Sequence, residues 1–181
     1  VSFGSKALTI DTSDNSGKAI TQSSGSLTAG ATTLSTTAAD ISIGQTGNDL
    51  SSIASNTTTS GDVTIGGSTG IALGASSVAG DLSVTATTGN VTDSGALTIA
   101  GTSAFTTSAD DATITLNTST NAFTGAVTLT TNDGDGTAAN VTIDGGTTAL
   151  VIAASTVDGD LTLTSGHTSG ITDSGTLTIG G

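Results

Sequence analysis

The chain has 181 residues, of which 15 are acidic and two are basic, so its formal net charge is −13. Without Cys and with a single His, it cannot form a disulfide framework or a zinc or thiolate site. Two cations are too few to neutralise nucleic-acid phosphates, and no apolar run approaches the ~20 residues that a bilayer span requires. We therefore expect neither a nucleic-acid partner nor membrane insertion.

Apolar residues recur in short alternating triplets along the whole chain. In each triplet a Thr or Ser separates two branched aliphatic residues, and Gly, Asn, Asp or Ser lies close by. This period-two alternation predicts short β-strands with one face inward and one face outward. In chain order the predicted strands are 8–10, 41–43, 63–65, 82–84, 97–99, 127–129, 141–143, 161–163 and 177–179.

Disorder is the alternative interpretation, because Gly, Ser and Thr together make up half of the chain. The apolar third of the chain is placed too regularly for a disordered segment, and no window has the apolar spacing of a helix. Pro is absent, as expected where most backbone N–H groups belong to a sheet ladder. The sequence therefore predicts an all-β protein.

The pattern also repeats on a longer scale. VAGDLSVTATTGNVTDSGALTIAG (78–101) returns as VDGDLTLTSGHTSGITDSGTLTIGG (157–181), and residues 63–78 match 141–157. A degraded copy, ITQSSGSLTAG, covers residues 20–30. We divide the chain into the end of one unit (1–30) and two full units (31–101 and 102–181), which form one continuous segment over 1–181.

Units of this length are too long for a single coil of a solenoid. Coils of about 20 residues, triangular in section, would place about four coils in a unit and about nine in the chain. The predicted fold is thus a parallel β-helix, and the alternative is a string of small β-sandwich domains, for which three Phe are too few. The side chains expected to point inward are Val63, Ile65, Leu82, Val84, Leu97, Ile99, Val141, Ile143, Leu161, Leu163, Leu177 and Ile179.

Catalytic chemistry is not predicted from any group of residues. Asp110 and Asp111 are the only adjacent acidic pair, and neighbours on a strand should point to opposite faces. His167 lies in a Gly- and Ser-rich stretch, where we interpret it as a solvated turn residue. There is no Arg to stabilise a developing negative charge and no Tyr or Trp platform for a sugar. We expect the protein not to be an enzyme.

Calcium is the one cofactor for which the sequence offers candidate ligands. Residues 132–137 (NDGDGT) alternate oxygen donors with glycines, as loops that bind hard cations do. Asp133 and Asp135 are the candidate metal ligands. The spacing is not that of an EF-hand, and the alternative is a polar turn without metal. The recurring Asp93 and Asp173, in two copies of TDSG, are interpreted as turn residues.

Several phrases resemble the repeats of very large bacterial surface proteins. They are the unit read at 91–105 and 171–181, ITLNTSTNAFTGAVTLT (114–130) and LVIAASTVDGDLTLT (150–164). The repeats are similar to those of filamentous-haemagglutinin-like adhesins and related β-strand-repeat proteins. The resemblance implies a right-handed parallel β-helix that is secreted to the cell surface and acts as a stalk in adhesion, aggregation or biofilm formation.

Two functions are therefore expected, and both are structural. In the first, the segment is a rod within a giant surface adhesin, and parts outside it bind glycans or proteins on a host or neighbouring cell. In the second, repeats assemble into an extracellular filament, matrix or sheath fibre. Neither end has the character of a capping element. We expect the chain to continue in both directions, or separate copies to abut end to end.

Overall fold

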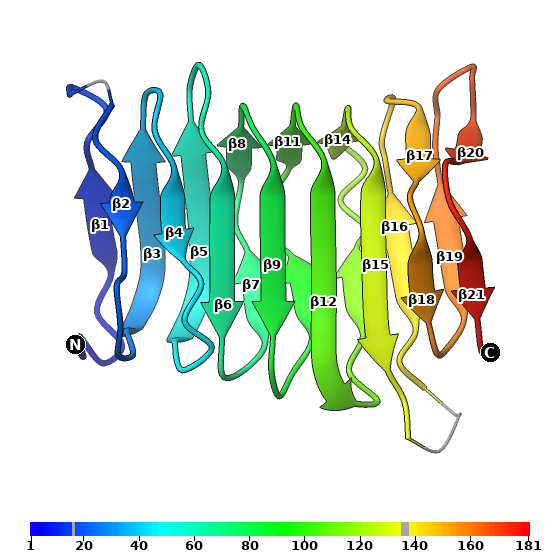
Figure 1. Ribbon diagram of the computed structural model, residues 1–181, viewed down its shortest axis with the longest axis horizontal. Coiled ribbons are helices and arrows are strands. Elements are labelled where there is room, and N and C mark those ends of the chain that lie inside the picture. Colours follow the sequence, from blue (N-terminus) through cyan, green and yellow to red (C-terminus); the bar gives the residue numbers. More distant parts are fainter. Residues whose placement is uncertain (16, 135–137) are drawn as a thin grey trace.

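The computed structural model describes residues 1–15, 17–134 and 138–181. The described chain forms a solenoid of about eight turns, in which every strand pairing is parallel and no helix occurs. Figure 1 shows the coils following one another along the long axis, from the N-terminus at one end to the C-terminus at the other. The predicted all-β parallel solenoid is confirmed, with about eight turns where about nine were expected.

Each coil contributes strands to two hydrogen-bonded sheets. One side of most coils is a single strand and the other is broken into two short strands, such as β7 and β8. The first sheet contains β1 (Leu8–Asp11), β3 (Thr28–Thr36), β5 (Asp49–Thr57), β7 (Ile71–Leu73), β8 (Ser76–Val78), β10 (Val91–Asp93), β11 (Leu97–Ile99), β13 (Ile114–Leu116), β14 (Ala122–Phe123), β16 (Val141–Asp144) and β19 (Leu161–Thr164).

The second sheet lies in front in Figure 1 and has ten strands. All nine triplets predicted as strands lie within strands of the two sheets. The nine-residue strands β3 and β5 were not anticipated. The second sheet contains β2 (Ile20–Thr21), β4 (Ile41–Ile43), β6 (Val63–Gly67), β9 (Leu82–Ala86), β12 (Ser103–Asp110), β15 (Val127–Asn132), β17 (Leu150–Ile152), β18 (Ser155–Val157), β20 (Ile171–Asp173) and β21 (Leu177–Ile179).

The core is a stack of aliphatic side chains in register from coil to coil. Ile65, Val84, Phe105 and Leu129 are successive partners in the second sheet, and all four are buried. The ring of Phe123, from the first sheet, meets the Phe105 ring edge to face, with centroids 6.1 Å apart. The two phenylalanines thus join the facing sheets in the middle of the rod.

The expected inward residues fall into two groups according to their coil. The eight between Val63 and Ile143 are buried, with exposed fractions of 3% or less. Leu161, Leu163 and Leu177 pack against the core but remain partly exposed, and Ile179 is exposed. Ile179 pairs with the fully buried Val157, so its register is as expected. It is exposed because no described coil lies over the outer edge of β21.

Equivalent parts of successive repeats lie in opposite sheets. The VTI sequence at 63–65 belongs to β6 in the second sheet, and the VTI at 141–143 belongs to β16 in the first. The same exchange relates β9 to β19, β10 to β20 and β11 to β21. From β6 the chain passes three full coils to β15 and then half a coil to β16. A repeat unit is therefore about 3.5 coils, and neighbouring units differ by half a turn about the rod axis.

Two serine side chains supply hydrogen bonds where a long strand pairs with two short strands of the next coil. The long strand β5 pairs with both β7 and β8, and β15 pairs with both β17 and β18. At the break, Ser76 Oγ accepts a hydrogen bond from Ser55 N (3.0 Å), and Ser155 Oγ accepts one from Leu129 N (2.9 Å). Each hydroxyl also donates to a carbonyl two residues earlier. The side chain thus satisfies a buried N–H that would otherwise lack a partner.

Steric contact with the neighbouring coil explains why glycine occupies the last position of the repeated TDSG. A Cβ at Gly95 would lie 2.6 Å from the backbone N of Ala75, and one at Gly175 would lie 2.5 Å from that of Ala154. The break between short strands brings the neighbouring coil's backbone too close for any side chain. This contact explains why the glycine recurs in both full units.

Candidate functional site

The sides of the rod carry the alternate polar side chains of the strands. Thr64, Ser83 and Thr98 are examples, and all three are exposed. His167 lies in an exposed turn, where its Nδ1 accepts a hydrogen bond from Ser169 N at 3.0 Å. This contact places His167 in the turn that the sequence indicated. The described part of the chain contains no helix with the length and hydrophobicity needed to cross a bilayer.

An acidic cluster lies at one corner of the rod. The carboxylates of Asp110, Asp111 and Asp133 each offer an oxygen within 4.8 Å of the others. Asp111 has a φ of 60°, just after the end of β12, so the strand alternation expected for the pair ends at Asp110. The expectation that these two side chains point to opposite faces was wrong, because Asp111 belongs to a turn.

The cluster contains one of the two residues proposed as calcium ligands. Asp133 comes from the coil that follows Asp110, and its carboxylate accepts a hydrogen bond from Ala138 N at 2.9 Å. Gly134 N donates to the Asp110 carboxylate, which ties the two coils together. Asp135 lies outside the described residues. Three carboxylates could hold a hard cation. Asp110 and Asp111 could be recognised as neighbours of Asp133 only from the stacking of the coils.

The large exposed apolar side chains lie at the two ends of the solenoid. We call Val1–Phe3 with β1 and β2 the N-terminal end surface, and β19, β20 and β21 the C-terminal end surface. Val1 is 82% exposed and Phe3 43%, while Ile171 is 42% exposed and Ile179 41%. The outer strands at each end also have one backbone edge without a neighbouring strand among the described residues. Both ends are thus open apolar sheet edges.

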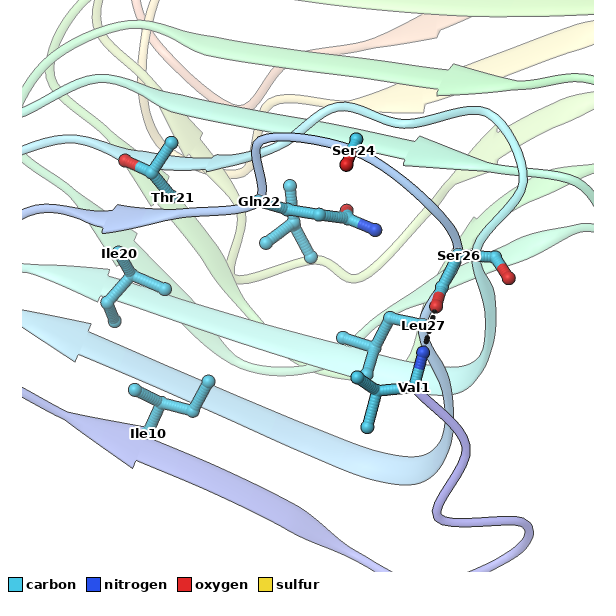
Figure 2. A pocket seen from close by; sticks show the side chains of 9 residues that line it. Val1, Ile10, Ile20, Thr21, Gln22, Ser24, Ser26 and Leu27 are labelled. Atoms are coloured by element: carbon cyan, nitrogen blue, oxygen red, sulfur yellow. Dashed lines mark hydrogen bonds between the residues drawn. The ribbon is translucent and has the colours of Figure 1, made fainter.

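A pocket of about 200 Å³ opens at the N-terminal end surface (Figure 2). Ile10, Ile20 and Leu27 give it an apolar wall, and the Val1 ammonium closes one side by donating to Ser26 O at 2.6 Å. The pocket is the unfilled end of the core stack.

At the end of β1, hydrogen bonds from the side chain and backbone N–H of Ser13 lower the pKa of the Asp11 carboxyl.

A fully buried asparagine joins consecutive coils in each repeat. Asn121 is 1% exposed and follows the turn between β13 and β14. Its Oδ1 accepts from Leu97 N (2.9 Å), and its Nδ2 donates to Asp93 Oδ2 (2.7 Å) in the preceding coil. Nδ2 also lies 3.4 Å from Leu116 O in its own coil. Asp93 therefore accepts bonds from the next coil, and its role goes beyond the local turn expected from the sequence.

The same arrangement occurs one repeat earlier. Asn48 is 0% exposed, and its Oδ1 accepts from Leu27 N at 2.8 Å. Its amide pairs with the amide of Gln22 through two bonds of 2.8 Å, and Nδ2 also donates to Ile43 O at 2.9 Å. Gln22 thus takes the place of Asp93. We call this asparagine with its two partners in the preceding coil the asparagine lock.

Sequence reasoning missed the asparagine lock. It assigned no role to Asn48 or Asn121, and both are buried. A signal was present, because both asparagines end a short polar turn five residues after an apolar triplet, at the same place in successive units (QTGNDL at 45–50 and TSTNAF at 118–123).

Comparison with protein families identifies a repeat family over nearly the whole chain. Repeats of unknown function (DUF5649) match residues 1–57, 60–130 and 138–181. The matched segments start at a different phase from units 31–101 and 102–181. No curated protein and no solved structure matched the chain.

Proposed function

We propose that the chain, which belongs to this family of repeats (DUF5649), is a rod segment of a secreted bacterial surface protein. The rod holds other parts of the protein away from the cell in adhesion, aggregation or biofilm formation. Those other parts bind the glycans or proteins of a host or neighbouring cell. The segment itself works outside the cell and catalyses no reaction.

The contrast between the sides and the ends of the solenoid carries this proposal. The sides are polar, with a net charge of −13 over the chain, whereas the ends expose Val1, Phe3, Ile171 and Ile179 on open sheet edges. Edges of this kind favour pairing with another strand. A solenoid that gains coils at its ends becomes longer without changing its sides, which suits a spacer.

Replacement of the segment in the native protein tests the proposal. An unrelated solenoid of equal length should preserve adhesion or aggregation, because a spacer contributes length. Deletion of the segment should reduce it, because the distal parts then lie closer to the cell. The replacement chain and the native chain should both be accessible to antibody on intact cells. Loss of adhesion in the replacement, with surface display intact, would instead indicate a binding domain.

A second candidate function is a filament of copies joined end to end. Lys6, Lys18 and the Val1 ammonium lie near the N-terminal end surface together with Asp11 and Asp14, whereas Asp158, Asp160 and Asp173 lie near the C-terminal one. The outermost strands β1 and β19 each have four residues with the same alternation of burial. Opposite charge and matching strands favour head-to-tail contact.

Sedimentation of the purified chain over a range of salt concentrations tests this candidate. Head-to-tail contact predicts association that grows with protein concentration and weakens with salt, because salt screens opposite charges. Changing both Lys6 and Lys18 to Glu should abolish it. The matched control changes Thr64 and Thr98, on the sides of the rod, to Glu and should not. A monomer at every concentration and salt would remove the filament candidate.

A further inference from the structure

The last coil of the chain repeats a coil that is covered in the middle of the rod. Residues 157–181 are the second copy of 78–101, and the first copy is covered by the coil of β12, β13 and β14. Beneath that cover, Val91 and Ile99 are 0% exposed, whereas their counterparts Ile171 and Ile179 are 42% and 41% exposed. The C-terminal end surface is therefore a known coil interface with its covering half missing from the described chain.

The polar half of the asparagine lock is also present there. Asp173 and Leu177 stand where Asp93 and Leu97 stand one unit earlier. Ser155 N donates to Thr176 O (3.0 Å), as the equivalent residues of the covered copy do, through a bond of 2.9 Å. In a parallel ladder this bond turns the next N–H, that of Leu177, toward the open edge.

We infer that Asp173 and Leu177 form a receptor for the asparagine of another repeat unit, so that the C-terminal end surface accepts one specific kind of coil. The occupant is a coil of the type found at 102–123, with its asparagine at the position of Asn121. The inference rests on the proposed rod function, since it states which coil continues the rod. The argument is continuity with the interface between β9–β11 and β12–β14.

The N-terminal coil of a second copy does not fit this receptor. Residues 1–30 contain one asparagine, Asn15, which is exposed in a turn and whose N–H donates to Thr12 O at 3.0 Å. A copy stacked through that coil would bury Asp173 and the Leu177 N–H without their asparagine. A buried carboxylate or N–H that loses its partner is costly, so the lock selects the phase of the following coil.

Two fusions of equal length separate the right phase from the wrong one. In the first, residues 102–181 are appended after Gly181; in the second, residues 1–80 are appended. Each adds 80 residues to the 181-residue chain. The half-turn relation places the appended copy of β12 in the first sheet, directly after β21 in the second. A third chain is the first fusion with the appended copy of Asn121 changed to Ala.

Hydrogen exchange at the Leu177 amide is the readout. The first fusion should slow its exchange at least ~10-fold relative to the 181-residue chain, because the amide becomes buried and bonded. The Ala chain and the second fusion should each lose most of this protection. As an internal reference, Asn121→Ala in the 181-residue chain should accelerate exchange at the Leu97 amide by a similar factor.

The outcomes distinguish the receptor from the rod. Equal protection of Leu177 in both fusions, or full protection in the Ala chain, would overturn the receptor and leave the rod proposal standing. No protection of Leu177, Ile171 or Ile179 in either fusion, with the appended residues folded by circular dichroism, would overturn both.

Discussion

Asn121 Nδ2 lies 2.7 Å from Asp93 Oδ2, and this bond joins two coils through residues that are 28 positions apart in the chain. Because the asparagine is buried, every polar atom of its side chain must find a partner in the protein. The bond thus fixes how one coil is seated on the coil before it. It is a specific polar contact beside a core made mostly of aliphatic side chains.

Asn121→Ala should lower the free energy of unfolding by about 2 kcal/mol, because Leu97 N is left buried without a partner and Asp93 loses its bond to the asparagine amide. Chemical denaturation measures the change. Asn117→Ala is the matched control, since the Asn117 side chain is exposed and only its backbone N–H contacts Asp93. The control should change stability by less than about 0.5 kcal/mol. Equal effects of the two substitutions would contradict the lock.

The asparagine lock also shows where sequence reasoning stopped. The alternation of apolar and polar residues predicted the nine triplet strands and the burial of Ile65, Val84 and other aliphatic residues, because this alternation is a local signal. It could not predict which polar residues turn inward, since burial of Asn121 or Ser155 depends on a neighbouring coil. The sequence of a single strand does not determine its register against the strand of the next coil.

The half-turn rotation between successive repeats could not be predicted from the sequence for a related reason. The number of residues per coil varies, from 19 between Val63 and Leu82 to 27 between Ile114 and Val141. Turns absorb these differences outside the strands, so a unit of known length does not reveal how many coils it contains. The acidic cluster at Asp110, Asp111 and Asp133 could not be assembled for the same reason.

Core substitutions should cost more in the middle of the rod than at its end. Leu129 is fully buried and Leu161 only partly so, although both occupy inward positions of strands. Leu129→Ala should cost about 3 kcal/mol, and Leu161→Ala less than half of that, because the smaller buried area leaves a smaller cavity. Thermal or chemical unfolding of the pair checks the ratio. A larger loss for Leu161→Ala would mean that the C-terminal coil is covered in solution.

Neutralising one member of the acidic cluster should stabilise the protein in low salt. Three carboxylates within 4.8 Å repel one another at neutral pH. Asp111→Asn removes one charge and retains a residue type that tolerates the left-handed backbone. The unfolding midpoint should rise by at most a few degrees, and the difference should shrink as salt screens the charges. An unchanged or lower midpoint in low salt would show that the repulsion is already balanced.

The same variant tests the calcium ligand proposed at Asp133. Simple screening predicts that calcium and magnesium raise the midpoint of the natural chain equally at equal ionic strength. A specific site predicts a larger rise with calcium, which is lost in Asp111→Asn. Equal curves for the two cations would remove Asp133 as a calcium ligand.

The length of repeat arrays tests the rod most directly. Small-angle X-ray scattering would compare the 181-residue chain with chains that carry one and two further copies of 102–181. Each copy should add about 3.5 coils, hence ~17 Å at the spacing of parallel strands, with an unchanged cross-section. Growth in the cross-section, or a radius of gyration that rises as slowly as in compact domains, would contradict the account.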